Sequence, residues 1–334
     1  MNRLLVVRLG SLGDLVHTLP AVAALRRGHP EIEIDWLVDA VHQDFLALVP
    51  PVTSVIALTD RTARAWWRAR RELRSRSYDV AADLQGLIKS AALARLSGAR
   101  EVVGFDRSSL REPAAAFFYT RTVDVGGTGH VVFKNLKLVS ALGAASGPLE
   151  FPIAVTDARA VDEVRRAISG PYAIINPGAA WPNKRWPVDR FGQIAAHLAE
   201  RHRLRSIVLW GPGERRLAES VVHASSGAAV VAPETRLPDL VALSREARLI
   251  VSGDTGPLHI AAAVGVPVVS LFGPTDPDRN GPWDERDVAL SRYGRCACHY
   301  QRRCRRDDWC LATIGVDEVE KAIDARLGGS GATS

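Results

Sequence analysis

The sequence lacks long apolar runs and is poor in aromatic residues. No hydrophobic stretch approaches the roughly 18–20 residues that a membrane-spanning helix needs. Residues 1–10 lack both the apolar segment and the small-residue cleavage site of a signal peptide. Aromatic residues make up 6% of the 334-residue chain and do not interleave with basic residues as in single-strand nucleic-acid binders. We therefore expect a cytoplasmic protein that does not bind nucleic acid.

Cysteine is scarce and confined to one short segment. Disulfides spread along the chain, which an oxidising compartment favours, are therefore excluded. Four thiolates could close a tetrahedral zinc site, although the spacing C-x-C-x5-C-x5-C is not a standard zinc motif. A structural metal, reduced thiols and local disulfides all remain open interpretations. The four residues concerned are Cys296, Cys298, Cys304 and Cys310.

The composition is that of a globular protein with an excess of positive charge. Hydrophobic residues make up 47% and charged residues 24%, which provides ample material for a core. The formal net charge of +6 favours an anionic partner, such as a nucleotide or an acidic lipid surface.

Short apolar runs typical of buried strands alternate with segments of helical periodicity, and this alternation occurs twice. It predicts parallel sheets covered by helices on both faces. A stretch rich in Gly, Ser and Pro at 143–152 separates the halves. We predict two doubly wound, Rossmann-like domains, 1–152 and 153–327, facing a central ligand cleft, and a disordered tail at 328–334. The predicted strands are 3–9, 33–38, 54–58, 79–83, 101–104, 172–176, 206–210, 228–231, 249–252 and 268–272.

The loop after the first strand reads Gly10-Ser-Leu-Gly-Asp14. A glycine such as Gly13 lets the backbone turn tightly and approach a ligand. Arg8 stands where the dinucleotide fingerprint GxGxxG has its first glycine, which weakens the case for a nicotinamide enzyme. Asp14 is either a helix cap or a functional carboxylate at the mouth of the cleft.

Three further loops of the second half follow predicted strands. Lys184 lies between two Trp-Pro pairs, which stiffen the loop and could aim its ammonium at a phosphate. Thr255 and Gly256 open a helix whose N–H groups form an anion site. Glu214 follows a Gly-rich turn and could bind a ribose, or simply favour the first turn of a helix.

For two side chains in these loops, a structural role is an alternative to a functional one. Asp254 could be a helix cap, and His259 could be a core histidine bonded to backbone. Because the strand ends should converge on one crevice, a bound diphosphate explains the loops together.

In this order, the loops resemble those of glycosyltransferase family 9, the lipopolysaccharide heptosyltransferases, over most of the chain. In the N-terminal half they look most like heptosyltransferase I. The cysteine cluster and the loop 10–12 depart from that pattern. The segments that carry the resemblance are GDLVHTLP at 13–20, DLQGLIKSAA at 83–92, REP at 111–113 with FY at 118–119, KRWP at 184–187, DTGPLH at 254–259 and FGPTDP at 272–277.

The resemblance implies a GT-B fold and inverting transfer of heptose from ADP-heptose, or a related nucleotide sugar, to Kdo-lipid A. No metal or other cofactor is implied in this reaction. On this basis Asp14 is the general base. Such a base typically raises the reaction rate about 10²–10⁴-fold. Lys184 and the amides around Thr255 and Gly256 hold the diphosphate and stabilise the departing ADP. The other donor-binding residues are Gly13, Glu214, Asp254 and His259.

A basic segment at 61–76 contains Trp66 and Trp67. It could be an ordinary solvated helix with its aromatic residues in the core. Alternatively, it binds the anionic acceptor at the inner face of the cytoplasmic membrane, where the protein would be peripheral. The candidate acceptor-binding residues are Arg61, Arg64, Arg68, Lys89, Arg107 and Arg111.

Two other functions remain open from the sequence. The chain could be a GT-B enzyme that uses a UDP- or GDP-linked sugar on another surface glycan. It could also be a non-catalytic module that binds a sugar nucleotide without turnover.

Overall fold

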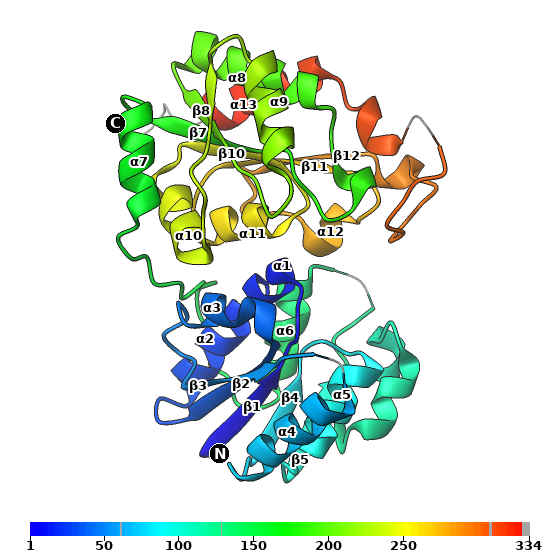
Figure 1. The fold of residues 1–334 in the computed structure, drawn as a ribbon. Coiled ribbons are helices and arrows are strands. Elements are labelled where there is room, and N and C mark those ends of the chain that lie inside the picture. The colour runs from blue at the N-terminus through cyan, green and yellow to red at the C-terminus, as the bar shows by residue number, and fades with distance from the viewer. Residues whose placement is uncertain (61, 128, 307–308, 329–334) are drawn as a thin grey trace. The chain divides into compact units, whose positions relative to one another are not determined.

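The computed structural model describes residues 1–60, 62–127, 129–306 and 309–328. It divides the chain after Ala154 into two compact units, each built on a six-stranded sheet of parallel strands (Figure 1). The prediction of two doubly wound α/β sheets is confirmed. Among the described residues, no helix has both the length and the apolar character needed to cross a membrane.

The N-terminal sheet has the strand order β3-β2-β1-β4-β5-β6. Its strands are β1 (Arg3–Val7), β2 (Glu33–Asp39), β3 (Ser54–Leu58), β4 (Val80–Asp83), β5 (Glu101–Phe105) and β6 (Arg121–Val123). The helices of this unit are α1 (Leu12–Val16), α2 (Leu19–Gly28), α3 (Gln43–Leu46), α4 (Ala63–Arg74), α5 (Ile88–Leu96) and α6 (Val131–Ser140). Helices α4 and α5 bury Ala65, Leu73 and Leu93 against β1 and its neighbours, and α2 packs against α6.

The C-terminal sheet has the order β12-β11-β10-β7-β8-β9. Its strands are β7 (Tyr172–Asn176), β8 (Arg205–Val208), β9 (Ala229–Val231), β10 (Leu249–Gly253), β11 (Val268–Phe272) and β12 (Val288–Ser291). The helices are α7 (Arg159–Ala167), α8 (Val188–His202), α9 (Arg215–Ala224), α10 (Leu237–Glu246), α11 (Gly256–Ala263), α12 (Pro277–Asn280) and α13 (Val316–Gly328). Residues of α8, α9 and α13 form a shared core with the sheet that includes Trp186 and Phe191.

Several elements differ from the sequence expectations. The predicted strands lie within a few residues of observed ones, but the edge strands β6 and β12 and the helices α3, α6, α7, α12 and α13 were not predicted. Two helices follow β1: α1 ends at Val16, and α2 begins after Thr18 with a proline in its first turn. Helix α13 continues to Gly328, and the rest of the predicted tail, 329–334, lies outside the described residues.

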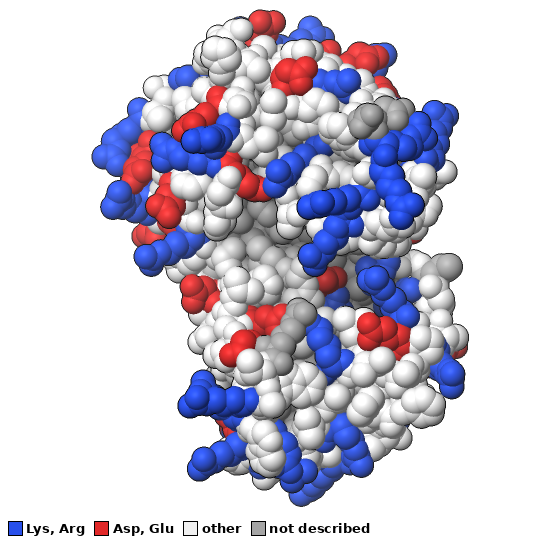
Figure 2. All heavy atoms as spheres, turned by 45° about the vertical axis from the view of Figure 1, so that its right-hand side comes forward, with Lys and Arg blue, Asp and Glu red and all other residues white. Residues whose placement is uncertain are grey.

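The strand order creates one switch point in each sheet. In the N-terminal sheet the winding reverses between β1 and β4, and in the C-terminal sheet between β7 and β10. Ligands of open α/β sheets bind beyond the carboxyl ends of the strands at such points. The face drawn in Figure 2 carries basic side chains distributed over both units, with acidic side chains among them.

Candidate active site

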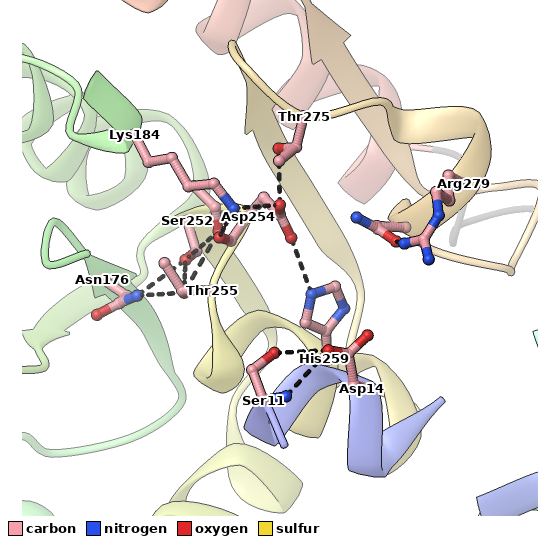
Figure 3. A network of polar contacts seen from close by, with 12 residues as sticks. Ser11, Asp14, Asn176, Lys184, Ser252, Asp254, Thr255, His259, Thr275 and Arg279 are labelled. Atoms are coloured by element: carbon pink, nitrogen blue, oxygen red, sulfur yellow. Dashed lines mark hydrogen bonds and ion pairs between the residues drawn. The ribbon is translucent and has the colours of Figure 1, made fainter. Parts of the chain in front are cut away.

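In the N-terminal unit, Asp14 lies on the short helix that follows β1, at that sheet's switch point. Its Oδ2 accepts hydrogen bonds from the backbone N–H and the hydroxyl of Ser11, at 2.9 and 3.0 Å (Figure 3). Its Oδ1 forms an ion pair with Arg8 Nη2 at 2.5 Å. The capping role considered for Asp14 is thus present, but it occupies only one carboxylate oxygen. Gly13 is buried in the same helix.

Arg8 and His42 belong to the surroundings of Asp14, although the sequence did not single them out as site residues. Arg8 is 4% exposed, and its guanidinium also donates to the backbone carbonyl of Leu84. His42 Nε2 lies 3.0 Å from the position that a Cβ at Gly10 would occupy. Burial lowers the pKa of His42, an effect that the charges of Asp39 and Asp14 oppose. A glycine at position 10 therefore allows this imidazole to approach the loop backbone.

In the C-terminal unit, three side chains meet around Asp254, just beyond β10. Lys184 Nζ lies 2.6 Å from Asp254 Oδ2, and Thr275 Oγ1 donates to the same oxygen at 2.7 Å (Figure 3). His259 Nε2 contacts Asp254 Oδ1 at 3.0 Å. Lys184 Nζ also lies 4.8 Å from the ring centroid of Trp181, so the loop tryptophan helps to position the ammonium.

This cluster is buried and strongly ionic. The side chains of Asp254 and Lys184 are 6% and 15% exposed. Burial alone would raise the pKa of Asp254, but the hydrogen bond from His259 and the charge of Lys184 outweigh it and hold that pKa well below its ordinary value. From the sequence, His259 could have been a core histidine bonded to backbone. Its ring nitrogen instead contacts the carboxylate of Asp254.

The first residues of α11 provide groups suited to an anion. Thr255 precedes the helix, and Gly256 and Pro257 form its first two residues. Because the first N–H groups of an α-helix have no partner within the helix, they favour a negative ligand. Asn176 Nδ2 donates to Thr255 Oγ1 at 2.8 Å and to Ser252 Oγ at 3.0 Å, which ties the ends of β7 and β10 together.

Glu214 occupies a neighbouring position at the start of α9. Its Oε1 accepts from Arg185 Nη2 at 3.0 Å, and its Oε2 accepts from the N–H of Gly211 at 3.3 Å. A Cβ at Gly178 would lie 2.1 Å from Glu214 Oε2, so only glycine leaves room for the carboxylate there. Arg185 also donates to the carbonyl of Ala179, which links the Lys184 loop to Glu214.

The candidate acceptor residues lie on two groups of elements in the N-terminal unit. Arg64 and Arg68 are exposed on α4, whereas Arg61 lies outside the described residues. Lys89 lies in the first turn of α5, after β4, and Arg107 follows β5. Arg111 is exposed in the segment whose next residue, Glu112, accepts from the N–H of Ile88 at 2.8 Å.

Two aromatic side chains near these basic residues face solvent. Trp67 is 66% exposed and lies 5.0 Å from the guanidinium of Arg70. Phe117 is 79% exposed and lies 5.7 Å from that of Arg107. Trp66, in contrast, packs partly buried against the core. The core interpretation of the α4 tryptophans therefore holds for Trp66 but not for Trp67.

The cysteine cluster contacts the Lys184 loop through Asn183. Cys296 Sγ and Cys298 Sγ are 3.5 Å apart, and Asn183 Nδ2 donates to Cys298 Sγ at 3.3 Å. Burial raises the pKa of Cys298 to about 11 and also raises those of Cys296 and Cys310. All four cysteines, including Cys304, are free thiols. Metal binding by this cluster stays a prediction.

Sequence reasoning missed several members of the site. Thr275 lies within the FGPTDP segment, so the motif was recognised without a role for its hydroxyl. Asn176 ends a predicted strand, where an amide could have been noted as a strand-end polar group. Arg8 and Arg185 offered no comparable signal, because their ion pairs depend on side chains brought together by the fold.

The family model and the similar sequences agree on one family. Residues 66–310 match the model of "Glycosyltransferase family 9 (heptosyltransferase)". The chain is 34% identical to lipopolysaccharide heptosyltransferase 1 of Pseudomonas aeruginosa, covering 97% of this chain and 98% of that protein. It is 30% identical to the protein of the same name from Escherichia coli K12, over 86% and 92% of the two chains. The solved structure of the E. coli heptosyltransferase WaaC with ADP matches with a TM-score of 0.76 and 26% identity, covering 98% of this chain and 99% of that one.

Proposed function

The chain belongs to glycosyltransferase family 9, and from this premise we propose that it transfers heptose from ADP-heptose to Kdo-lipid A in the assembly of the lipopolysaccharide inner core. The similarity to a lipopolysaccharide heptosyltransferase 1 over 97% of the chain carries the proposal. The fold is GT-B, as the resemblance to the family implied. The proposed reaction inverts the anomeric carbon and needs no metal.

The C-terminal unit is the proposed donor-binding domain. Lys184 would contact the diphosphate, and the first N–H groups of α11, next to Thr255 and Gly256, would bind the same anion. These positive groups would stabilise the charge that develops on ADP as the sugar–phosphate bond breaks. Since Lys184 already contacts Asp254, its ammonium is pre-positioned at the strand end.

Asp254 and Glu214 are the proposed acceptors of hydrogen bonds from donor hydroxyls, on the sugar and on the ribose respectively. Asp254 remains ionised because His259 and Lys184 stabilise its charge, so it stays an acceptor-only group. Glu214 is held by Arg185 and by the N–H of Gly211. Each carboxylate is thus oriented before a ligand arrives, which lowers the entropic cost of binding.

Asp14 of the N-terminal unit is the proposed general base. It would take the proton from the acceptor hydroxyl as that oxygen attacks the anomeric carbon, while the bond to ADP breaks. The contacts from Arg8 and Ser11 fix the orientation of the carboxylate. After transfer the proton would pass from Asp14 to solvent, restoring the base.

The N-terminal unit is the proposed acceptor-binding domain, and it would approach the inner face of the cytoplasmic membrane. Lys89, Arg107 and Arg111 would pair with the carboxylates and phosphates of the acceptor. Exposed Trp67 beside Arg70 combines an apolar ring with a cation, as is common where proteins meet anionic lipid. Arg64 and Arg68 on the same helix add to this basic surface.

The deciding experiment is a transfer assay with ADP-heptose and Kdo-lipid A, preceded by a thermal-shift panel. The panel contains ADP-heptose, ADP, UDP-GlcNAc, GDP-mannose and NAD. A ligand present at 100 times its Kd stabilises the fold by about 2.7 kcal/mol, which a melting curve detects. We expect stabilisation by ADP-heptose and ADP alone, followed by formation of heptosylated acceptor. Stabilisation by a UDP or GDP sugar instead, with no transfer from ADP-heptose, would refute the proposed donor.

A further inference from the structure

Two histidines of α8 and a carboxylate of α13 converge on one point. His197 Nε2 and His202 Nε2 lie 2.9 and 2.6 Å from the same oxygen, Asp324 Oδ1. One ligand atom from each of the three residues lies within 4.8 Å of the other two. The two imidazole centroids are 5.6 Å apart with the rings nearly edge to face. Three N and O donors from two separate helices thus share one small volume.

We propose that His197, His202 and Asp324 bind a divalent transition-metal ion, with Zn²⁺ as the leading candidate. Imidazole nitrogen and carboxylate oxygen are typical zinc ligands, at about 2.0–2.2 Å from the ion. Ligand atoms around a tetrahedral ion at that radius lie roughly 3.3 Å apart. Small side-chain rotations that lengthen the present contacts would therefore admit the ion, and a water molecule would complete its coordination.

Glu320 is the nearest candidate for the outer contact of such a site, although its present distance is longer than a hydrogen bond. Its Oε1 lies 3.7 Å from His197 Nδ1, on the side of the ring opposite Asp324. Histidines that bind a metal through one nitrogen usually donate a hydrogen bond from the other, often to a carboxylate. Glu320 would favour the Nδ1–H tautomer of His197 and leave the Nε2 lone pair for the ion. Protons that leave the Nε2 atoms on binding pass to Nδ1 or to solvent.

The position of the site indicates a structural role. His202 is the last residue of α8, about 20 Å along the helix from its start near the Lys184 loop. The start of the same helix is already tied to the segment before α13, because Arg190 Nη1 donates to the carbonyls of Ala312 and Ile314 at 2.6 and 2.7 Å. A metal at the far end would fasten α13 to α8 a second time. Both histidine side chains are 17% exposed, and Asp324 is 39% exposed, so an ion can enter from solvent.

The test measures Zn²⁺ binding by calorimetry, and Co²⁺ binding by absorption, on the metal-free full-length protein. The variants are His202→Ala, Asp324→Asn and Glu320→Gln, with His223→Ala on α9 as the matched control. Co²⁺ also distinguishes this site from the cysteine cluster, since thiolate ligands add a charge-transfer band that nitrogen and oxygen ligands lack. Alkylating the cysteines before a second titration separates the two sites independently.

We expect one equivalent of metal that persists after alkylation and has no thiolate band. Its affinity should fall at least 100-fold in His202→Ala and Asp324→Asn, about 10–100-fold in Glu320→Gln, and not at all in His223→Ala. Bound Zn²⁺ should also raise the Tm of the wild type but not that of His202→Ala. If a variant unfolds, Cu²⁺ bound to the alkylated wild type should still show nitrogen hyperfine splitting in electron paramagnetic resonance. No binding after alkylation, or binding unchanged in both ligand variants, would overturn the proposal.

Discussion

Arg8 Nη2 lies 2.5 Å from Oδ1 of Asp14, so a buried guanidinium holds the carboxylate that we propose as the catalytic base. In the sequence, Arg8 drew attention only because it stands where the dinucleotide motif GxGxxG has its first glycine. In the fold it follows the last residue of β1, donates to the carbonyl of Leu84 and pairs with Asp14 on α1. The arginine that replaces the first glycine of the dinucleotide motif therefore orients the Asp14 carboxylate.

We predict that Asp14→Asn lowers kcat by about 10²–10⁴-fold while the fold and the affinity for ADP are retained. Asparagine keeps the shape and the acceptor oxygen of the side chain but cannot take a proton. Arg8→Met should lower kcat by a smaller factor, because the base remains but its orientation is lost. Steady-state kinetics with ADP titrations measure both effects, and the exposed Asp44→Asn serves as control. Full turnover in Asp14→Asn would remove this residue as the base.

Lys184→Met should abolish donor binding and also destabilise the protein. The substitution leaves Asp254 buried without its cation, and breaking a buried pair in this way costs up to about 3–5 kcal/mol. Chemical denaturation and ADP titration measure the two effects. Lys321→Met is the matched control, since Lys321 is 81% exposed and lies 3.9 Å from its acidic neighbour. Unchanged ADP affinity in Lys184→Met would contradict a contact with the diphosphate.

The lowered pKa of Asp254 predicts a particular dependence of stability on pH. Because its pKa is lower in the folded than in the unfolded state, its ionisation stabilises the fold above the unfolded value of about 3.9. That contribution is lost as the pH falls through and below this value. Wild type should therefore be more stable than Asp254→Asn at pH 7, and the difference should shrink toward pH 3. Urea unfolding of both proteins at several pH values measures it, and a difference independent of pH would contradict the assignment.

Some strands could be predicted from their own residues, whereas others form only through pairing with distant parts of the chain. Strands β3, β7 and β11 have the predicted limits, because a short, mainly apolar run bounded by proline, glycine or polar residues is typical of a strand. Strands β6 and β12 escaped prediction because they are short and partly exposed, and neither RTV nor VALS is a continuous apolar run of ordinary strand length. Their pairing depends on neighbours that only the folded sheet provides.

The same distinction applies to the site. Asp14, Lys184 and Asp254 could be proposed from the sequence because each follows a predicted strand in a recognisable loop. The grouping of Lys184, Asp254 and Thr275 could not be read from the sequence, since these residues come from three loops separated along the chain. The proximity of Gly178 to Glu214 likewise could not be read from the sequence, because the two residues come from different loops.

Gly178→Ala should weaken donor binding without unfolding the protein. The new methyl group would lie 2.1 Å from Glu214 Oε2 and displace that carboxylate from Arg185 and Gly211. Loss of a hydrogen bond to a charged group corresponds to about 1.5–3 kcal/mol, or roughly 10–100-fold in donor affinity.

Titration with ADP should give the same result for Gly178→Ala and Glu214→Gln. Gly294→Ala is the control, because no atom lies within 4 Å of the added Cβ. Normal affinity in both site variants would exclude Glu214 from the ribose contact.

Trp67→Ala should weaken the binding of the full-length protein to anionic vesicles. Trp67 is 66% exposed on α4, and its indole would enter the interface while Arg70 pairs with lipid phosphate. Each basic residue near such a surface contributes about 1 kcal/mol, so Arg70→Gln should lower partitioning roughly fivefold, and salt should weaken it further. Phe133→Ala is the matched control, since Phe133 is 58% exposed on α6, outside the basic helix. Vesicle sedimentation measures all three variants, and an equal loss in Phe133→Ala would show that the contact is not specific to α4.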